Sequence, residues 1–128
     1  MNEFIEQFLV ESRELVEQTS RDLLALEKDS ANKESLDGAF RGFHTLKGGA
    51  AIVDFGAMTR ALHAAENMLS SVRSNIRPVT RTLIGDCLAC LDQVLKWLDA
   101  IDSSGTLSPA ADAEADRLIA RFARQSEA

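Results

Sequence analysis

The stretch LDGAFRGFHTLKGGA, residues 36–50, decides the fold that this sequence predicts. Its apolar residues recur every three or four positions and therefore lie on one broad arc of an α-helix. No proline or charge cluster interrupts this period, so we expect a helix from about residue 34 to residue 53. A helix with one apolar arc needs neighbouring helices to cover it, which favours a bundle. The arc consists of Leu36, Ala39, Phe40, Phe43, Leu46 and Ala50.

Four other segments repeat this helical period, and none alternates with the period of two that marks a strand. The breaks between them are short, so neighbouring helices should run antiparallel. The expected fold is all-α: an up-and-down antiparallel four-helix bundle with an additional C-terminal fifth helix. The other expected helices are 4–26, 57–74, one with Thr80 as its N-cap that reaches about Ile101, and one that starts at Ser108-Pro109 and ends near Arg124.

The composition is that of an ordinary globular domain. Of the 128 residues, 45% are hydrophobic and 27% are charged, so we expect residues 1–128 to form a single domain. The formal net charge of −6 argues against nucleic-acid binding and against a polybasic membrane anchor. No apolar run approaches the roughly 18 residues of a membrane span, and the acidic N-terminus does not resemble a signal peptide. We therefore expect no membrane insertion, a cytoplasmic location and reduced thiols at Cys87 and Cys90.

His44, Lys47 and Gly48 are expected to share one face of the helix, one turn apart. A side chain at position 48 would lean back over the imidazole of His44, but glycine has none, so the ring stays uncovered. Glycine inside a helix costs about 1 kcal/mol relative to alanine, and Gly49 repeats that cost. We interpret Gly48 and Gly49 as residues that keep the backbone bare for access to His44.

Glu66 is expected to lie beside His44. The turn between the second and third helices centres near Phe55, and the two residues lie equally far before and after it. Antiparallel helices therefore bring them to the same height. A carboxylate that accepts from one ring N–H fixes the tautomer and leaves the other nitrogen free as a nucleophile. Lys47 would attract an incoming anion, and His63, one turn from Glu66, could donate to that anion or restrain the carboxylate.

These parts suit a histidine that accepts a phosphoryl group, because a nitrogen–phosphorus bond is labile and the group can be passed on. The sequence contains no G-x-x-x-x-G-K-S/T loop for ATP and no carboxylate pair placed to hold Mg²⁺. The domain is therefore expected to carry phosphate without a cofactor of its own.

Residues 44–50, HTLKGGA, resemble the H-x-I/L-K-G-x-A/S signature of histidine phosphotransfer (HPt) domains. Residues 63–69, HAAENML, resemble the H-x-x-E-N-x-L stretch of the N-terminal P1 domain of chemotaxis histidine kinases of the CheA type. The separation of the two motifs also fits, and the resemblance covers the first four helices well and the fifth loosely. Residues 51–54, AIVD, are more aliphatic than the glycine and aromatic stretch usual in that family, which affects packing at the helix end.

The resemblance implies that His44 is the phosphorylated residue, that Glu66 holds its ring, and that Lys47 and His63 are supporting basic residues. It implies that the kinase domain of a partner chain binds ATP and Mg²⁺ and phosphorylates His44 in trans. The phosphoryl group would then pass to an aspartate of a response regulator. The isolated domain would not be an enzyme, and the chain would be the N-terminal fragment of a longer histidine kinase. A stand-alone phosphotransfer protein of a multistep phosphorelay is the nearest alternative.

Less specific interpretations also exist. His44 can be a polar residue that is merely satisfied at the core margin, or the domain can be a structural interaction module. A metal-binding bundle using His44, His63 and Glu66 is a third possibility, although three ligands are few. Cys87 and Cys90 have the C-x-x-C spacing of a redox or zinc half-site, but both fall on the expected buried stripe. We therefore expect core packing for the cysteines and no metal site.

Overall fold

The computed structural model describes residues 2–127, which form five α-helices and no strand. The all-α class is confirmed, and the first three helices match their expected bounds within two residues. None of the helices within residues 2–127 has the length and apolar character needed to span a bilayer. The helices are α1 (Glu3–Lys28), α2 (Lys33–Ile52), α3 (Gly56–Arg73), α4 (Arg81–Ser104) and α5 (Ala111–Glu127).

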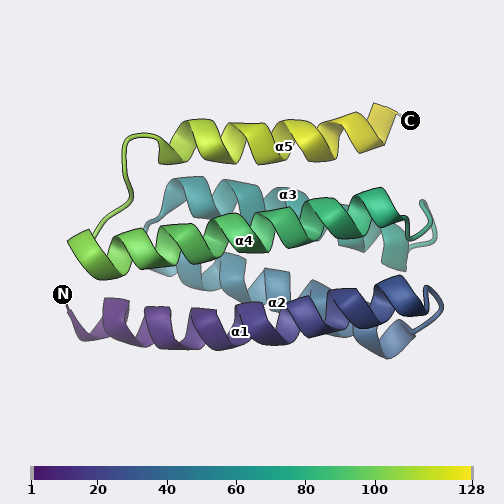
Figure 1. The fold of residues 1–128 in the computed structure, drawn as a ribbon, viewed down its shortest axis with the longest axis horizontal. Coiled ribbons are helices and arrows are strands. Elements are labelled where there is room, and N and C mark those ends of the chain that lie inside the picture. Colours follow the sequence, from purple (N-terminus) through teal and green to yellow (C-terminus); the bar gives the residue numbers. More distant parts are fainter. Residues whose placement is uncertain (1, 128) are drawn as a thin grey trace.

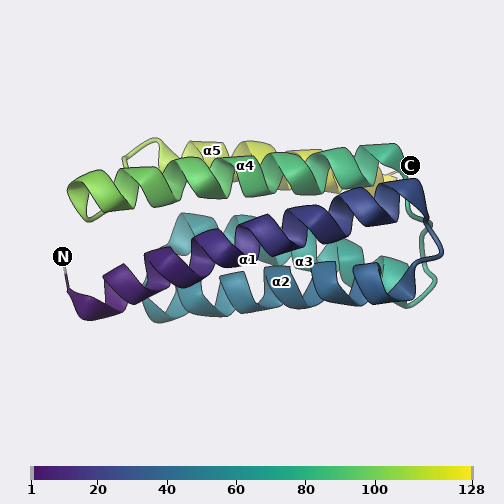
Figure 2. The same cartoon turned by 60° about the horizontal axis from the view of Figure 1, so that its bottom comes forward.

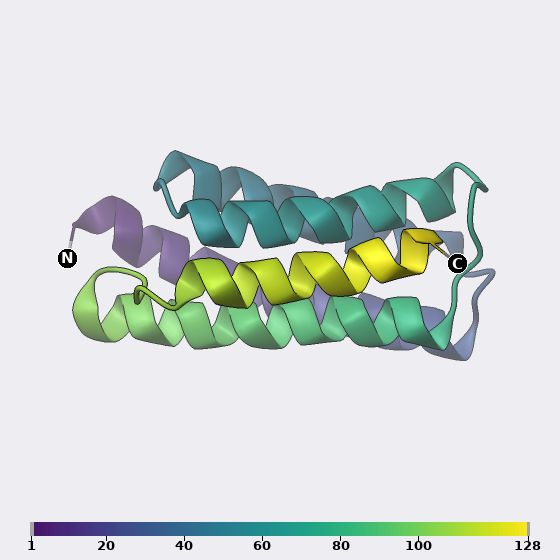
Figure 3. The same ribbon diagram turned by 90° about the horizontal axis from the view of Figure 1, so that it is seen from above.

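Successive helices run in opposite directions along the long axis of the molecule (Figure 1). Helices α1 to α4 form a ring in which each packs on the next and α4 returns to α1 (Figure 2). Helix α5 packs on α3 and α4 from outside this ring (Figure 3). The expected up-and-down four-helix bundle with an additional fifth helix is therefore confirmed.

Local capping interactions set the helix starts. The side chain of Asn2 accepts a hydrogen bond from the backbone N–H of Ile5 at 2.8 Å, and that of Asn32 accepts from Ser35 at 3.0 Å. Thr80 caps α4 as predicted, because its hydroxyl oxygen accepts from the N–H of residue 83 at 3.1 Å. Each cap satisfies a first-turn amide that has no partner inside its helix.

The expected end of the fourth helix and start of the fifth are wrong by a few residues. Helix α4 continues past Ile101 to Ser104, where Gly105 adopts a left-handed conformation with φ of 80° and stops it. Pro109 is not the first residue of a helix. Ser108 forms a turn instead. Its hydroxyl oxygen accepts a hydrogen bond from the backbone N–H of Ala110 at 3.2 Å, and its carbonyl oxygen accepts one from the N–H of Ala111 at 3.1 Å.

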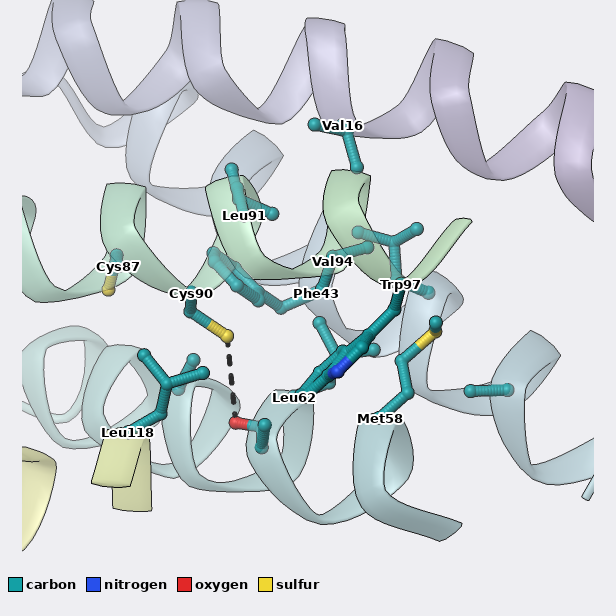
Figure 4. Close-up of a cluster of buried hydrophobic side chains, with 14 of the residues drawn as sticks. Val16, Phe43, Met58, Leu62, Cys87, Cys90, Leu91, Val94, Trp97 and Leu118 are labelled. Atoms are coloured by element: carbon teal, nitrogen blue, oxygen red, sulfur yellow. Dashed lines mark hydrogen bonds between the residues drawn. The ribbon is translucent and has the colours of Figure 1, made fainter. Parts of the chain in front are cut away.

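One stripe of each helix forms the hydrophobic core, which Figure 4 shows around Phe43. Phe43 and Leu46 of α2 are fully buried. Their burial fixes how α2 is rotated about its own axis, so the two positions between them face outward. The indole of Trp97 in α4 donates to the Glu114 side chain of α5 at 3.1 Å, which ties the fifth helix to the bundle.

The two cysteines lie in this core, as predicted. Both are free and fully buried, and the Cys90 thiol lies 3.8 Å from the carbonyl oxygen of Ala61 (Figure 4). Burial raises the pKa of Cys90 to about 12 and raises the pKa of Cys87 well above its usual value. Both groups are therefore protonated at neutral pH, which makes them unreactive and unsuited to bind a metal.

Candidate functional site

The imidazole of His44 lies at the outer edge of the bundle. The apolar residues of α2 on either side of it are buried in the core and hold this part of the helix in place. Its side chain is 65% exposed, although Phe43 beside it is fully buried. The ring of Phe40, one turn earlier, lies stacked on the imidazole with 6.3 Å between the ring centroids. The core thus fixes the base of the side chain, while the ring itself faces solvent.

Glu66 of α3 holds this ring from the neighbouring helix. Its Oε2 lies 2.6 Å from Nδ1 of His44, so the hydrogen bond predicted from the equal heights of the two residues is confirmed. Its Oε1 accepts from the Nζ of Lys47 at 2.8 Å. Only 10% of the Glu66 side chain is exposed, whereas both partners reach toward solvent. One buried carboxylate therefore aligns two side chains of α2.

The electrostatics of this cluster keep Glu66 ionised. Burial opposes the charged form, but the hydrogen bonds from Lys47 and His44 and the positive charge of Lys47 outweigh it and lower the pKa of the carboxyl group. An ionised carboxylate can only accept hydrogen bonds, so Nδ1 of His44 must carry the proton and donate it. In the neutral ring, the lone pair is then on Nε2, the nitrogen that does not face Glu66.

The two consecutive glycines differ in their surroundings. A Cβ atom at Gly48 would meet nothing within 4 Å outside its own helix, so the space beside the helix is open there, as expected. A Cβ atom at Gly49 would instead lie 3.4 Å from the ring of Phe8 in α1. The position of Gly49 supports a role in packing α2 against α1, whereas the space beside Gly48 is open.

His63 lies on the exposed side of α3, one turn before Glu66. Among the described residues it makes no hydrogen bond or ion pair, and both oxygens of Glu66 are bonded to other side chains. The restraint of Glu66 by His63 is therefore not seen in this structure. A contact between His63 and an incoming anion stays a prediction.

Sequence reasoning assigned Phe40 to the apolar arc and missed its place beside the imidazole. The guanidinium of Arg73 lies 4.4 Å from the centroid of the Phe40 ring and also pairs with Asp37 at 3.0 Å. Phe40 thus contacts both Arg73 and His44. Its spacing of four residues from His44 was the available signal, because such residues are neighbours on a helix.

A metal site is not supported by the arrangement. Within residues 2–127, no group of three or more histidine, cysteine, aspartate or glutamate side chains is placed to hold a metal ion. The ammonium group of Lys47 occupies the second oxygen of Glu66, where a cation would have to bind. The geometry instead suits a nucleophilic nitrogen beside an anion-binding surface.

Comparison with known proteins places this site in a family. The model of the Hpt domain family matches residues 3–103, which comprise α1 to α3 and nearly all of α4. The chain therefore belongs to the Hpt domain family. Within that family it is similar to the chemotaxis protein CheA of Treponema pallidum, with 34% identity over 120 residues. That similarity covers 94% of this chain but only 14% of the relative's length.

Two solved structures show the same fold. The solution structure of the histidine phosphotransfer domain of CheA has a TM-score of 0.82 and 31% identity, and the match covers 92% of this chain and 90% of that one. The CheA phosphotransferase domain from Thermotoga maritima has a TM-score of 0.75 and 30% identity, and the match covers 79% of this chain and 98% of that one. The resemblance recognised in the two sequence motifs is thereby confirmed.

Proposed function

We propose that this domain is a cytoplasmic phosphocarrier of chemotaxis-type two-component signalling. Nε2 of His44 accepts a phosphoryl group from the ATP-binding domain of a histidine kinase and donates it to an aspartate of a response regulator. The observation that carries this proposal is the 2.6 Å hydrogen bond between Nδ1 of His44 and Glu66, because it leaves Nε2 unprotonated on an exposed ring.

Glu66 assists both transfer steps without moving a proton. In the first step, the lone pair of Nε2 attacks the γ-phosphorus of ATP, the nitrogen–phosphorus bond forms, and the bond to the oxygen of ADP breaks. The ring becomes positively charged, and the carboxylate of Glu66 stabilises that charge through Nδ1–H. In the second step, a carboxylate oxygen of the response regulator attacks phosphorus, and the electron pair of the broken bond returns to Nε2.

The neighbouring residues of His44 provide access and charge. Lys47, which is one turn from His44, would offset part of the negative charge of the bound phosphoryl group. His63 would add a second donor from α3. The space beside Gly48 is open, since even a methyl group there would meet no neighbour within 4 Å. ATP and Mg²⁺ would be held by the kinase domain.

Kinase activity itself belongs, in this proposal, to protein domains outside the present sequence. The chain spans 14% and 16% of the lengths of the CheA relatives from Treponema pallidum and Halobacterium salinarum. Its role is to present the substrate histidine as the N-terminal domain of a longer kinase of this type. The similarity to CheA favours this setting over a stand-alone phosphorelay protein.

The test is phosphorylation of the purified domain by a CheA-type kinase domain with radiolabelled ATP. His44→Gln should abolish labelling that is labile in acid and stable in base, and mass spectrometry should map the added phosphoryl group to residue 44. His63→Gln removes the only other histidine and should still be labelled. Labelling of His44→Gln at the wild-type level would overturn the assignment.

A further inference from the structure

A cavity of about 730 Å³ lies apart from the His44 site. It is open to solvent, and its lining comes from the loop between α3 and α4, the first turns of α4 and the last turns of α5. Figure 3 shows this end of α5 beside that loop. The volume falls in the range of about 300–1,000 Å³ typical of sites for small molecules. No residue of the His44 cluster lines the cavity.

The side chains that line this cavity carry a local excess of positive charge. Arg77, Arg121 and Arg124 contribute guanidinium groups, and Asp86 contributes a carboxylate. Asp86 is buried, pairs with Arg121 at 2.7 Å and also accepts from the side chain of Gln125. Its charge is therefore already balanced by Arg121. The two other arginines add positive charge to the cavity of a chain whose net charge is −6.

Those two arginines lack strong partners within the described part of the chain. The Nε atom of Arg77 is buried and has no hydrogen-bond partner there, and its Nη1 reaches only the backbone oxygen of Gln125 at 3.5 Å. Arg124 is exposed, and it makes no hydrogen bond or ion pair with the side chains that the structure describes, those of residues 2–125. Because the Nε atom of Arg77 is buried, an anion in the cavity would be bound by the other guanidinium nitrogens of Arg77 and by Arg124.

The rest of the cavity wall completes a site for an anion with an organic part. The cavity reaches Thr82 in the first turn of α4, where the helix dipole and unpaired amides favour negative charge. The lining also includes the apolar side chains of Ile76 and Pro78, and Ile76 is 74% exposed.

We propose that this cavity binds a small phosphate monoester. The phosphate lies between Arg77, Arg124 and the start of α4, and the organic group packs on Ile76 and Pro78. Two separate guanidinium groups suit a doubly charged phosphate, which offers several oxygens to separate donors. The family model ends at residue 103, so the part of the site contributed by α5 lies outside the region that defines the family.

The experiment is an NMR and calorimetric titration of the whole 128-residue domain with phenyl phosphate and with inorganic phosphate at constant ionic strength. Phenyl phosphate should bind saturably with a stoichiometry of one, about threefold or more tightly than inorganic phosphate. Shift changes should cluster at residues 76–82 and 121–125. Arg77→Gln and Arg124→Gln should each weaken binding about tenfold or more. Arg124 is exposed, so its variant keeps the test valid if Arg77→Gln misfolds.

Arg41→Gln is the matched control, because it removes the same charge from the exposed face of α2. It should change the affinity by less than about twofold. Unsaturable shifts spread over the whole surface would overturn the proposal, as would equal losses in all three variants. Equal affinity for phenyl phosphate and inorganic phosphate would contradict the organic part of the ligand.

Discussion

At the scale of the residue, Glu66 is the side chain on which the geometry of the phosphoacceptor ring depends. Its carboxylate is bonded to the imidazole, and it approaches from a different helix. A ring held in this way does not have to be oriented anew for each transfer, which lowers the entropic cost of reaching the reactive geometry. The same hydrogen bond also fixes which nitrogen reacts.

We therefore predict that Glu66→Ala slows phosphorylation of His44 about 10- to 100-fold, the usual effect of removing a residue that orients a functional histidine. Glu66→Gln should fall between this variant and the wild type, because its amide oxygen can still accept from Nδ1 but carries no charge. The measurement is the initial rate with a saturating kinase domain. Unchanged rates in both variants would show that the hydrogen bond is dispensable.

The ionisation of Glu66 also predicts how stability depends on pH. Its pKa is lower in the folded protein than the ordinary value of 4.5, so the unfolded chain binds this proton more readily. The stabilising contribution is complete above pH 4.5 and is lost as the pH falls through the lower folded value. Urea unfolding should thus show a larger stability difference between wild type and Glu66→Gln at pH 6 than at pH 3. An identical difference at both pH values would contradict the shift.

At the scale of the element, α2 carries glycines whose surroundings predict opposite effects of the same substitution. A Cβ atom at Gly42 would collide with the buried side chain of Thr19 in α1, whereas one at Gly48 would meet open space. Small residues on the α1 side of α2 therefore let the two helices approach closely, while Gly48 weakens the helix without any packing benefit.

We predict that Gly48→Ala stabilises the domain by up to about 1 kcal/mol, since alanine is the better helix former. Gly42→Ala should destabilise it by about 1–3 kcal/mol, because α1 and α2 must move apart. Chemical unfolding of both variants measures the two effects, and each serves as the control of the other. Changes of the same sign would contradict the difference in packing.

The sequence pattern predicted these elements unequally well. The apolar period identified all five helices, and Thr80 was recognisable because a threonine directly precedes a long apolar run. The junction of α4 and α5 was not predictable in detail. Gly105 ends α4, and a turn at Ser108 precedes α5, but the sequence offers several neighbouring residues at which either boundary could have fallen.

The functional site, too, was predicted only in part. His44 could be paired with Glu66 because the two residues are equally far from the turn. In antiparallel helices, residues equally far from the connecting turn lie at the same height along the bundle. The contact of Gly49 with Phe8 and that of Arg73 with Phe40 depend on how far each helix rotates against its neighbour. Rotation follows from packing of the entire core, so single-helix patterns do not reveal it.

At the scale of the whole molecule, α5 is an addition to a bundle that the family model describes without it. It buries Ala111, Ala115, Leu118 and Phe122 against the other helices. Its polar contacts are spread along its length, from Glu114 with Trp97 to Arg121 with Asp86. The four-helix bundle should therefore fold without α5, but at lower stability.

Trp97 is the only tryptophan of the chain and reports on this arrangement. We predict that deletion of residues 107–128 shifts its fluorescence to longer wavelength, because the indole loses both its cover and its hydrogen bond to Glu114. The free energy of unfolding should fall by about 3 kcal/mol or more, since burial of Leu118 and Phe122 is lost. Far-UV circular dichroism controls for retained helix. An unshifted emission spectrum would place the indole outside the influence of α5.

The double restraint on Glu66 has a consequence for the order of events in signalling. Lys47 and His44 occupy both carboxylate oxygens before any phosphoryl group arrives, so the reactive nitrogen has one fixed position and one open direction. Under the proposed function, the phosphate donor and the phosphate acceptor must both enter from that direction. They therefore exclude one another, and a domain already engaged by the kinase is hidden from the regulator until the kinase departs.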